Sequence, residues 1–199
     1  YTLDDQLIQA FKEYDPDTVQ KSIDAMNGFA ANHPDMQVSL MLAPTAQELF
    51  SSEIPAYAGY LSEKSFIDEC YKKMSGISTV DCLSFLSGHK NDYVFYRTDH
   101  HWTSLGAYYA YCAAAKTLGY SSYGLDSFNI ETASSSFRGT LYSKTLDNSI
   151  TPDSIDYYML ASGEPKVKMT VFDGRNETVY DSMYVRSYLD VKDKLSLIH

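Results

Sequence analysis

Three short apolar runs and the helical patterns around them limit the folds open to the first 120 residues. The runs are MQVSLMLAP (36–44), GISTVDCL (76–83) and DYVFYRT (92–98), which have the length and composition of buried strands. A helical pattern separates the first two runs at residues 62–74, and another follows the third at residues 103–119. Strands joined by helical crossovers pair in parallel. The sequence therefore predicts an α/β fold whose layered core contains a parallel sheet.

Two more helices are expected before the first of these runs. Residues 3–14 have a helical pattern, with Thr2 in the capping position. A second helix is predicted to start at Asp15, because Pro16 follows it and proline is favoured in the first helical turn. Apolar side chains then recur on one face of this helix, at Val19, Ile23, Met26 and Ala30.

The character of the sequence changes after about residue 120. Polar, turn-rich segments alternate with the short candidate strands SIDYYML, KVKMTVFD and ETVYDSMYV. We expect a single domain over residues 1–199, with an α/β core at 1–120 and an irregular or antiparallel, β-rich extension at 121–199. The chain opens at Tyr1 without a methionine, so we expect an excised piece of a longer protein. We also expect the domain to be truncated at its C-terminus, for the reason given below.

Charge and hydropathy argue against two classes of partner. The formal net charge of −10 is spread along the chain, which disfavours nucleic acid and anionic membranes. No run of 18 apolar residues occurs, so direct membrane insertion of this piece is not expected. The 18 tyrosines outnumber the nine phenylalanines, and their amphipathic rings suit contact with sugars or peptides as well as ordinary packing.

The stretch from Asp99 to Trp102 concentrates chemistry just before the helical pattern at 103–119. An acid, two histidines and the single tryptophan occupy four consecutive positions. If the run at 92–98 is a parallel strand, the stretch lies beyond its carboxyl end, where open α/β sheets bind ligands. In an extended backbone, residues two apart share a side, so Asp99 pairs with His101 and His100 points away. A carboxylate beside an imidazole is the arrangement that a general base requires.

Two other interpretations of this stretch stay open. Asp99 could cap the following helix while His101 merely packs. A metal site through His100 or His101 is disfavoured, because adjacent histidines do not easily converge on one ion. The remaining histidines, His33, His89 and His199, show no ligand spacing. We therefore predict no metal and no cofactor.

The segment YRTDHHWTSLGAYYAY resembles the signature of the DHHW protein family, which is similar to the SGNH-hydrolase-like alginate O-acetyltransferases of bacterial envelopes. VSLMLAPTAQELFSSEIPAY and FRGTLYSKTL resemble two further segments of that family. The resemblance implies an SGNH-hydrolase-like layered core. It also implies that Asp99 and His101 are the acid and base of a Ser-His-Asp triad, with His100 in a variable position.

The same resemblance exposes a gap at the nucleophile. In these relatives the serine follows the D-x-H segment, on a Gly/Lys-Asp-Ser type turn after an apolar strand. The Asp-Ser pairs at 126–127 and 181–182 do not follow such a strand. We expect the serine beyond this chain, with Ser196 as a weaker candidate.

The resemblance further implies an extracytoplasmic acyl esterase or O-acetyltransferase that acts on a surface polysaccharide and works with a membrane-bound acetyl donor protein. Trp102 is expected either to form a wall of the sugar site or to plug the core, and Arg138 and Tyr142 to reach the site. The alternative function is a non-catalytic module that binds a glycan or peptide at the bacterial cell surface.

Overall fold

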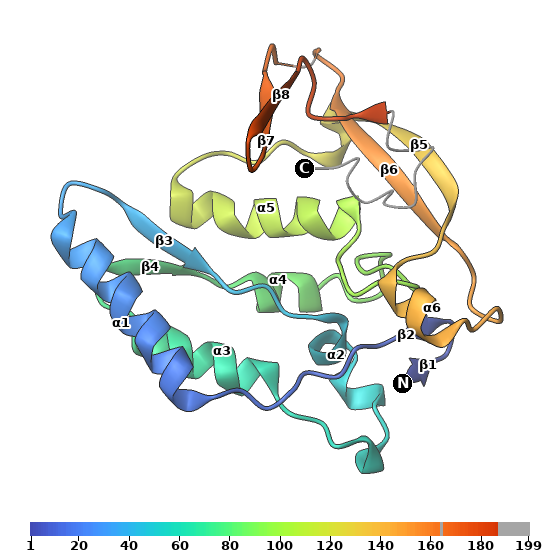
Figure 1. Cartoon of the computed structure of the whole chain (residues 1–199), viewed down its shortest axis with the longest axis horizontal. Helices are drawn as coiled ribbons and strands as arrows, with labels where there is room; N and C mark the ends of the chain where they lie inside the picture. Colours follow the sequence, from blue (N-terminus) through green and yellow to red (C-terminus); the bar gives the residue numbers. More distant parts are fainter. Residues whose placement is uncertain (164, 187–199) are drawn as a thin grey trace. The chain divides into compact units, whose positions relative to one another are not determined.

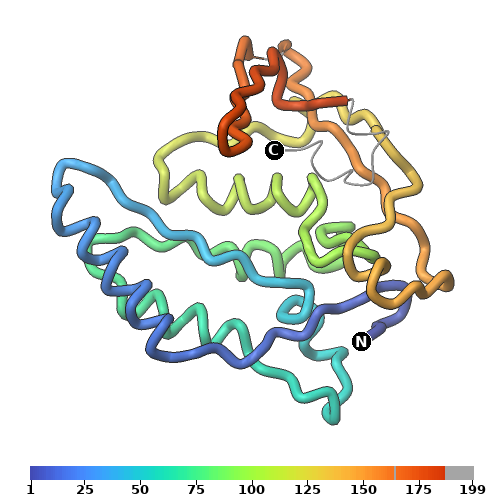
Figure 2. The backbone as a smooth tube through the Cα atoms, in the orientation of Figure 1, coloured from blue at the N-terminus to red at the C-terminus, as the bar shows by residue number. Residues whose placement is uncertain are grey.

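The computed structural model describes residues 1–163 and 165–186, which divide between two compact units (Figure 1). The first unit comprises residues 1–122 and 138–151, and the second comprises residues 123–137 together with those from 152 onward. The chain, traced in Figure 2, leaves the first unit after Ser122 and returns to it at Arg138, as the division of its contacts gives.

A pair of parallel strands lies at the centre of the first unit. Strand β3 (Val38–Met41) pairs with β4 (Ile77–Val80) in a register that places Val38 beside Ile77 and Met41 beside Val80. Figure 1 shows α1 (Pro16–Asn32) and α3 (Glu63–Lys72) on one side of this pair and α5 (Ser104–Leu118) on the other. Two shorter helices, α2 (Ala46–Leu49) and α4 (Cys82–Ser87), follow the two strands. The parallel pairing predicted for the first two apolar runs is confirmed.

Helix α1 begins where the sequence predicts, and α5 matches the predicted range of 103–119 within one residue at each end. The side chain of Asp15 accepts a hydrogen bond from the backbone N–H of Asp17, and Pro16 occupies the first turn of α1. Thr103 caps α5 by accepting from the N–H of Gly106. Gly119 then ends α5 in the left-handed conformation, with φ of 74°.

The helix expected over residues 3–14 is wrong. The chain instead forms a short hairpin of β1 (Thr2–Leu3) and β2 (Gln6–Leu7) and then runs without regular structure to α1. Leu7 packs with Leu141 and Ile150, whereas the next residue, Ile8, belongs to a different cluster. Consecutive side chains that face opposite ways require an extended backbone, which a helix cannot supply.

The strand expected over residues 92–98 is also wrong, and no third parallel strand joins β3 and β4 within the described residues. This run is apolar because Val94, Phe95 and Tyr96 are buried, but it folds back on the residues that follow it. The N–H of Thr103 donates to the carbonyl of Val94 at 3.0 Å, and the N–H of Tyr96 donates to the carbonyl of His101 at 3.2 Å. Asp99 to His101 therefore lie at the tip of a tight loop rather than beyond a parallel strand.

The second unit is antiparallel, as predicted for the C-terminal part of the chain. Strand β5 (Phe128–Phe137) pairs with β6 (Asp153–Leu160), and β7 (Met169–Asp173) pairs with β8 (Asn176–Tyr180). Strand β5 lies in the polar sequence after residue 120 that was expected to be turn-rich, and it was not among the predicted strands. Residues 138–151, which carry helix α6 (Thr140–Thr145), belong to the first unit. The boundary expected near residue 120, between the α/β core and the extension, stays a prediction.

None of the helices in the described part of the chain combines the length and the apolar character needed to cross a membrane.

Candidate functional site

The loop that carries Asp99 and the two histidines is fixed by packing at its base. Val94 and Phe95 belong to the main apolar cluster of the first unit, and Trp102, half-buried, packs against that cluster. A Cβ atom added at Gly106 would lie 2.2 Å from the carbonyl oxygen of Val94. Glycine at this position therefore lets the first turn of α5 pack directly on the base of the loop.

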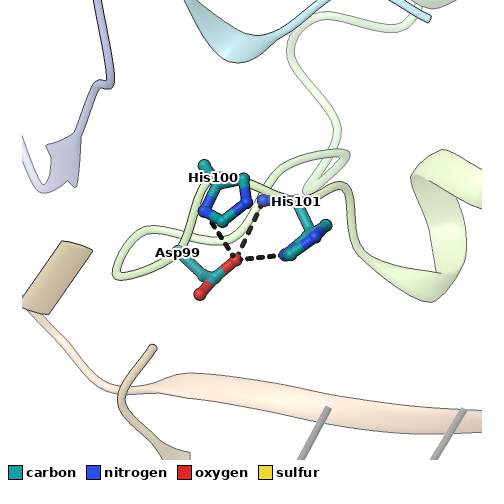
Figure 3. Close-up of side chains that lie close together, drawn as sticks. All are labelled: Asp99, His100 and His101. Carbon is teal, nitrogen blue, oxygen red and sulfur yellow. Dashed lines mark hydrogen bonds and ion pairs between the residues drawn. The ribbon is translucent and has the colours of Figure 1, made fainter. Parts of the chain in front are cut away.

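Asp99 and His101 form the contact that their two-residue spacing predicts. Oδ1 of Asp99 lies 2.6 Å from Nδ1 of His101 and also accepts the backbone N–H of His101 at 3.0 Å (Figure 3). Asp99 is 1% exposed, whereas the side chain of His101 is 54% exposed. An ionised carboxylate only accepts hydrogen bonds, so Nδ1 of His101 carries the proton. In the neutral ring, Nε2 is then left with a free lone pair.

The other oxygen of Asp99 is held by the start of α6. Oδ2 accepts from the N–H of Thr140 at 2.7 Å and from its hydroxyl at 2.9 Å. A Cβ atom added at Gly139 would lie 2.4 Å from both Cβ and Oδ2 of Asp99, so this backbone approach requires glycine. The N–H of Gly139 donates to the hydroxyl of Thr98 at 2.9 Å.

These partners were missed at the sequence level, although the motif that contains them was singled out. Within FRGTLY, the long side chains Arg138 and Tyr142 were predicted to reach the site. The residues that contact Asp99 are instead the two small ones, Gly139 and Thr140. A Gly-Thr pair gives no periodic or charge signal from which its contact 41 residues back along the chain could be read.

Hydrogen bonding keeps Asp99 ionised despite its burial. Burial alone would raise the pKa of the carboxyl, but the backbone N–H groups of Thr140 and His101, together with their side chains, outweigh it and hold the pKa below its ordinary value. The site therefore contains a fixed negative charge beside His101.

His100 lies on the same loop and is bonded differently. Its Nδ1 is 2.9 Å from the hydroxyl of Thr140 and 3.6 Å from Oδ1 of Asp99. The second distance is within ion-pair range but too long for a hydrogen bond. His101, and not His100, therefore hydrogen-bonds Asp99, as predicted. The expectation that His100 points away from Asp99 is wrong, because the loop is not extended and the two histidine rings lie 4.0 Å apart (Figure 3). Burial, with the neighbouring charges of His101 and Lys144, lowers the pKa of His100, although Asp99 opposes this effect.

The three side chains also bear on metal binding, because one donor atom from each of Asp99, His100 and His101 lies within 4.8 Å of the others. The adjacent histidines therefore do bring their ring nitrogens together, contrary to the argument from spacing. The 2.6 Å between Oδ1 of Asp99 and Nδ1 of His101 is, however, a hydrogen-bond distance. Two ligands of a tetrahedral zinc ion, each at about 2.0–2.2 Å, lie roughly 3.3 Å or more apart. This geometry favours a hydrogen-bonded cluster, and the lack of a metal stays a prediction.

The remaining residues singled out in the sequence are not gathered around His101 by the described contacts. The guanidinium of Arg138 lies 4.3 Å from the ring centroid of Tyr142 and donates to the carbonyl of Ile150 at 3.2 Å. The hydroxyl of Tyr142 donates to Asn148 at 2.8 Å. Their roles in substrate binding, and that of Trp102, stay predictions. Ser196 lies outside the described residues.

The first unit thus combines a pair of parallel strands flanked by helices with a buried carboxylate that is hydrogen-bonded to an exposed imidazole. The profile of the DHHW protein family matches residues 11–184, and the chain belongs to this family.

Three solved structures are similar to the chain. A DHHW family protein from Eubacterium siraeum is 29% identical with a TM-score of 0.68, over 77% of this chain and 50% of that one. Bacillus cereus PatB1 with a sulfonyl adduct is 16% identical with a TM-score of 0.75, over 92% and 63% of the two chains. The O-acetyltransferase domain of Pseudomonas putida AlgJ is 16% identical with a TM-score of 0.52, over 75% and 59%. No curated protein matches the sequence.

These likenesses confirm the suspected relationship and a mixed helix and strand fold with small sheets, similar to that of PatB1 and the AlgJ domain. At 16% identity they show the fold alone. The chain spans 50–63% of the length of these three structures.

Proposed function

We propose that this chain is part of an SGNH-like O-acetyltransferase or acetyl esterase that acts on a surface polysaccharide outside the cytoplasm. The carrying observation is the pair of Asp99 and His101, in which a buried carboxylate fixes the ring of an exposed histidine. Support for the acyl-transfer class comes from the fold shared with the O-acetyltransferase domain of AlgJ.

In this proposal His101 is the general base and Asp99 orients it. Nε2 of His101 takes the proton of a serine hydroxyl while the serine oxygen attacks the acetyl carbonyl. The imidazolium, stabilised by Asp99, then returns the proton to the leaving alcohol, and an acetyl-serine ester remains. An acceptor hydroxyl, of a sugar or of water, attacks that ester through the same base and releases the serine. The serine lies outside the residues that the structure describes.

The remaining proposed roles concern the substrate. Trp102 offers an aromatic face to a sugar ring, and the stacked pair of Arg138 and Tyr142 offers a cation and a hydroxyl to its polar groups. The acetyl group would come from a membrane-bound donor protein if the reaction is a transfer.

The test compares this chain with a longer parent protein that contains a strand ending in an Asp-Ser turn. The 199-residue chain should show no appreciable activity on a simple acetyl ester, whereas the longer protein should. In the longer protein, His101→Ala should reduce turnover by at least about 10³-fold, and His100→Ala should cost far less.

Each other outcome has a definite meaning. Equal losses at both histidines would contradict the assigned roles. Activity in the 199-residue chain that Ser196→Ala abolishes would place the nucleophile within this chain. A longer protein that binds a surface glycan through Trp102 but cleaves no acetyl ester would be a binding module instead.

A further inference from the structure

The hydroxyl of Thr140 connects the second histidine of the loop to the buried acid. It lies 2.9 Å from Oδ2 of Asp99 and 2.9 Å from Nδ1 of His100. The backbone N–H of the same threonine donates to the same carboxylate oxygen at 2.7 Å. The triad arrangement proposed above uses Asp99 and His101 and assigns no part to His100 or Thr140.

Counting protons fixes the direction of these hydrogen bonds. An ionised carboxylate is purely an acceptor, so the hydroxyl of Thr140 must donate its single proton to Oδ2 of Asp99. The oxygen of the hydroxyl can then only accept a hydrogen bond from His100. Nδ1 of His100 must therefore carry a proton and donate it to Oγ1 of Thr140.

We propose that Thr140 and His100 are a positioning pair for Asp99, in which His100 donates to the hydroxyl of Thr140 and so directs that hydroxyl to Oδ2. With Oδ2 held by the N–H and the O–H of one residue, the carboxylate cannot rotate, and Oδ1 stays aimed at His101. The close contact with Gly139 blocks the movement of Asp99 on the same side. The catalytic meaning of this pair rests on the proposed function, but its hydrogen-bond geometry does not.

Nuclear magnetic resonance of the 199-residue chain tests this geometry directly. Two-bond proton–nitrogen spectra of ¹⁵N-histidine-labelled protein, recorded at a pH where the rings are neutral, report which ring nitrogen carries the proton. His100→Asn and His101→Asn variants assign the two rings. We expect both rings to be protonated at Nδ1. A His100 ring protonated at Nε2 would overturn the proposal.

Matched variants of Thr140 distinguish the loss of its hydroxyl from a general disturbance of the fold. Thr140→Val keeps the shape and the backbone N–H but removes the acceptor of His100, so His100 should shift toward the Nε2-protonated form. Thr140→Ser restores the hydroxyl and should restore the native tautomer. An unchanged His100 spectrum in a folded Thr140→Val protein would refute the pair. If Thr140→Val does not fold, the tautomer of His100 in the native chain still tests the proposal.

The catalytic consequence is measured separately in the longer parent protein. Thr140→Val should lower kcat roughly 10- to 100-fold with little change in KM, as expected when a hydrogen bond to a charged group is lost, and Thr140→Ser should recover most of it. A kcat unchanged by Thr140→Val would overturn the positioning role. If the unmodified longer protein has no acyl-transfer or esterase activity, the proposed function fails, while the spectra still test the pair.

Discussion

Asp99 shows how a fully buried acid can remain charged. Two hydrogen bonds reach Oδ1 from His101, and two reach Oδ2 from Thr140. Three of the four come from the backbone or from a hydroxyl, which carry no charge of their own. The negative charge on Asp99 therefore does not depend on a positively charged partner, and in the neutral ring of His101 the lone pair of Nε2 is not used by Asp99.

Replacement of Asp99 by asparagine should lower stability in a pH-dependent way. The amide puts N–H groups where acceptors are needed, so the free energy of unfolding should fall by about 1–3 kcal/mol at pH 7. Burial raises the pKa of Asp99, but hydrogen bonding lowers it by more, so the folded pKa lies below the unfolded value of about 3.9. The carboxylate therefore contributes its full stability above the unfolded pKa, and this contribution is lost as the pH falls through the folded pKa. Urea unfolding at several pH values should show the difference between the two proteins shrinking below pH of about 4. A constant difference would contradict this.

His100 should affect stability in a different pH range. Burial lowers its pKa, so between the folded value and the unfolded value of about 6.5 the unfolded chain binds more protons, and stability falls as the pH drops. A His100→Asn variant keeps an N–H donor for Thr140 but cannot titrate. Thermal unfolding should show a smaller loss of stability between pH 7 and pH 5 in the variant than in the native chain. A larger loss in the variant would show that the pKa of His100 is not lowered.

At the scale of elements, two glycines decide how closely backbones approach the loop of Asp99. Gly139 brings the start of α6 against Asp99, and Gly106 brings α5 against Val94. A side chain at either position would need space that the backbone or Asp99 occupies. The loop is therefore held between two helix starts.

Gly139→Ala should disturb both the fold and the site. Its Cβ would lie 2.4 Å from Asp99, so we expect a cost of about 1–3 kcal/mol from overpacking and a displaced carboxylate. Gly28 in α1 is the control, because nothing lies within 4 Å of an added Cβ. Gly28→Ala should stabilise the chain by about 0.5–1 kcal/mol, since alanine is the better helix former. Urea unfolding measures both changes, and equal effects at the two positions would contradict the close contact at Gly139.

Elements with strong local signals were predictable, and those fixed by distant contacts were not. Asp15 with Pro16 marks the start of α1, and Thr103 and Gly119 mark the two ends of α5, by their own chemistry. The run at 92–98 is apolar because it is buried, and burial alone does not distinguish a strand from a folded-back loop. The Asp99 to His101 contact was predicted from the two-residue spacing, although the extended backbone assumed for it is a folded-back loop. The contribution of Thr140 depends on a segment 41 residues away, which no local pattern indicates.

At the scale of the whole molecule, charge is the dominant property. The chain carries 26 acidic against 16 basic residues, a formal net charge of −10. Such an excess of negative charge makes the compact state repel itself. It also favours neutral or cationic partners over anionic ones.

Stability should therefore rise with moderate salt at neutral pH. Raising sodium chloride from about 10 mM to about 200 mM shortens the screening length from about 30 Å to below about 10 Å, so the melting temperature should increase. Near the isoelectric point of about 4.8 the net repulsion vanishes, and the same change of salt should have little effect. Differential scanning calorimetry at the two pH values tests this. An equal rise at both would point to ion binding rather than screening.

The contact between Asp99 and Thr140 also sets an order of events during synthesis. The two residues are 41 positions apart, which at ordinary translation rates is roughly 2–8 s of elongation. In that interval His101 can already bond Oδ1, but Oδ2 has none of the Thr140 donors and must keep its water. Residues 123–137, which belong to the second unit, are made within the same interval. A nascent chain that pauses before Thr140 contains Asp99 and both histidines but lacks the two donors that replace water at Oδ2.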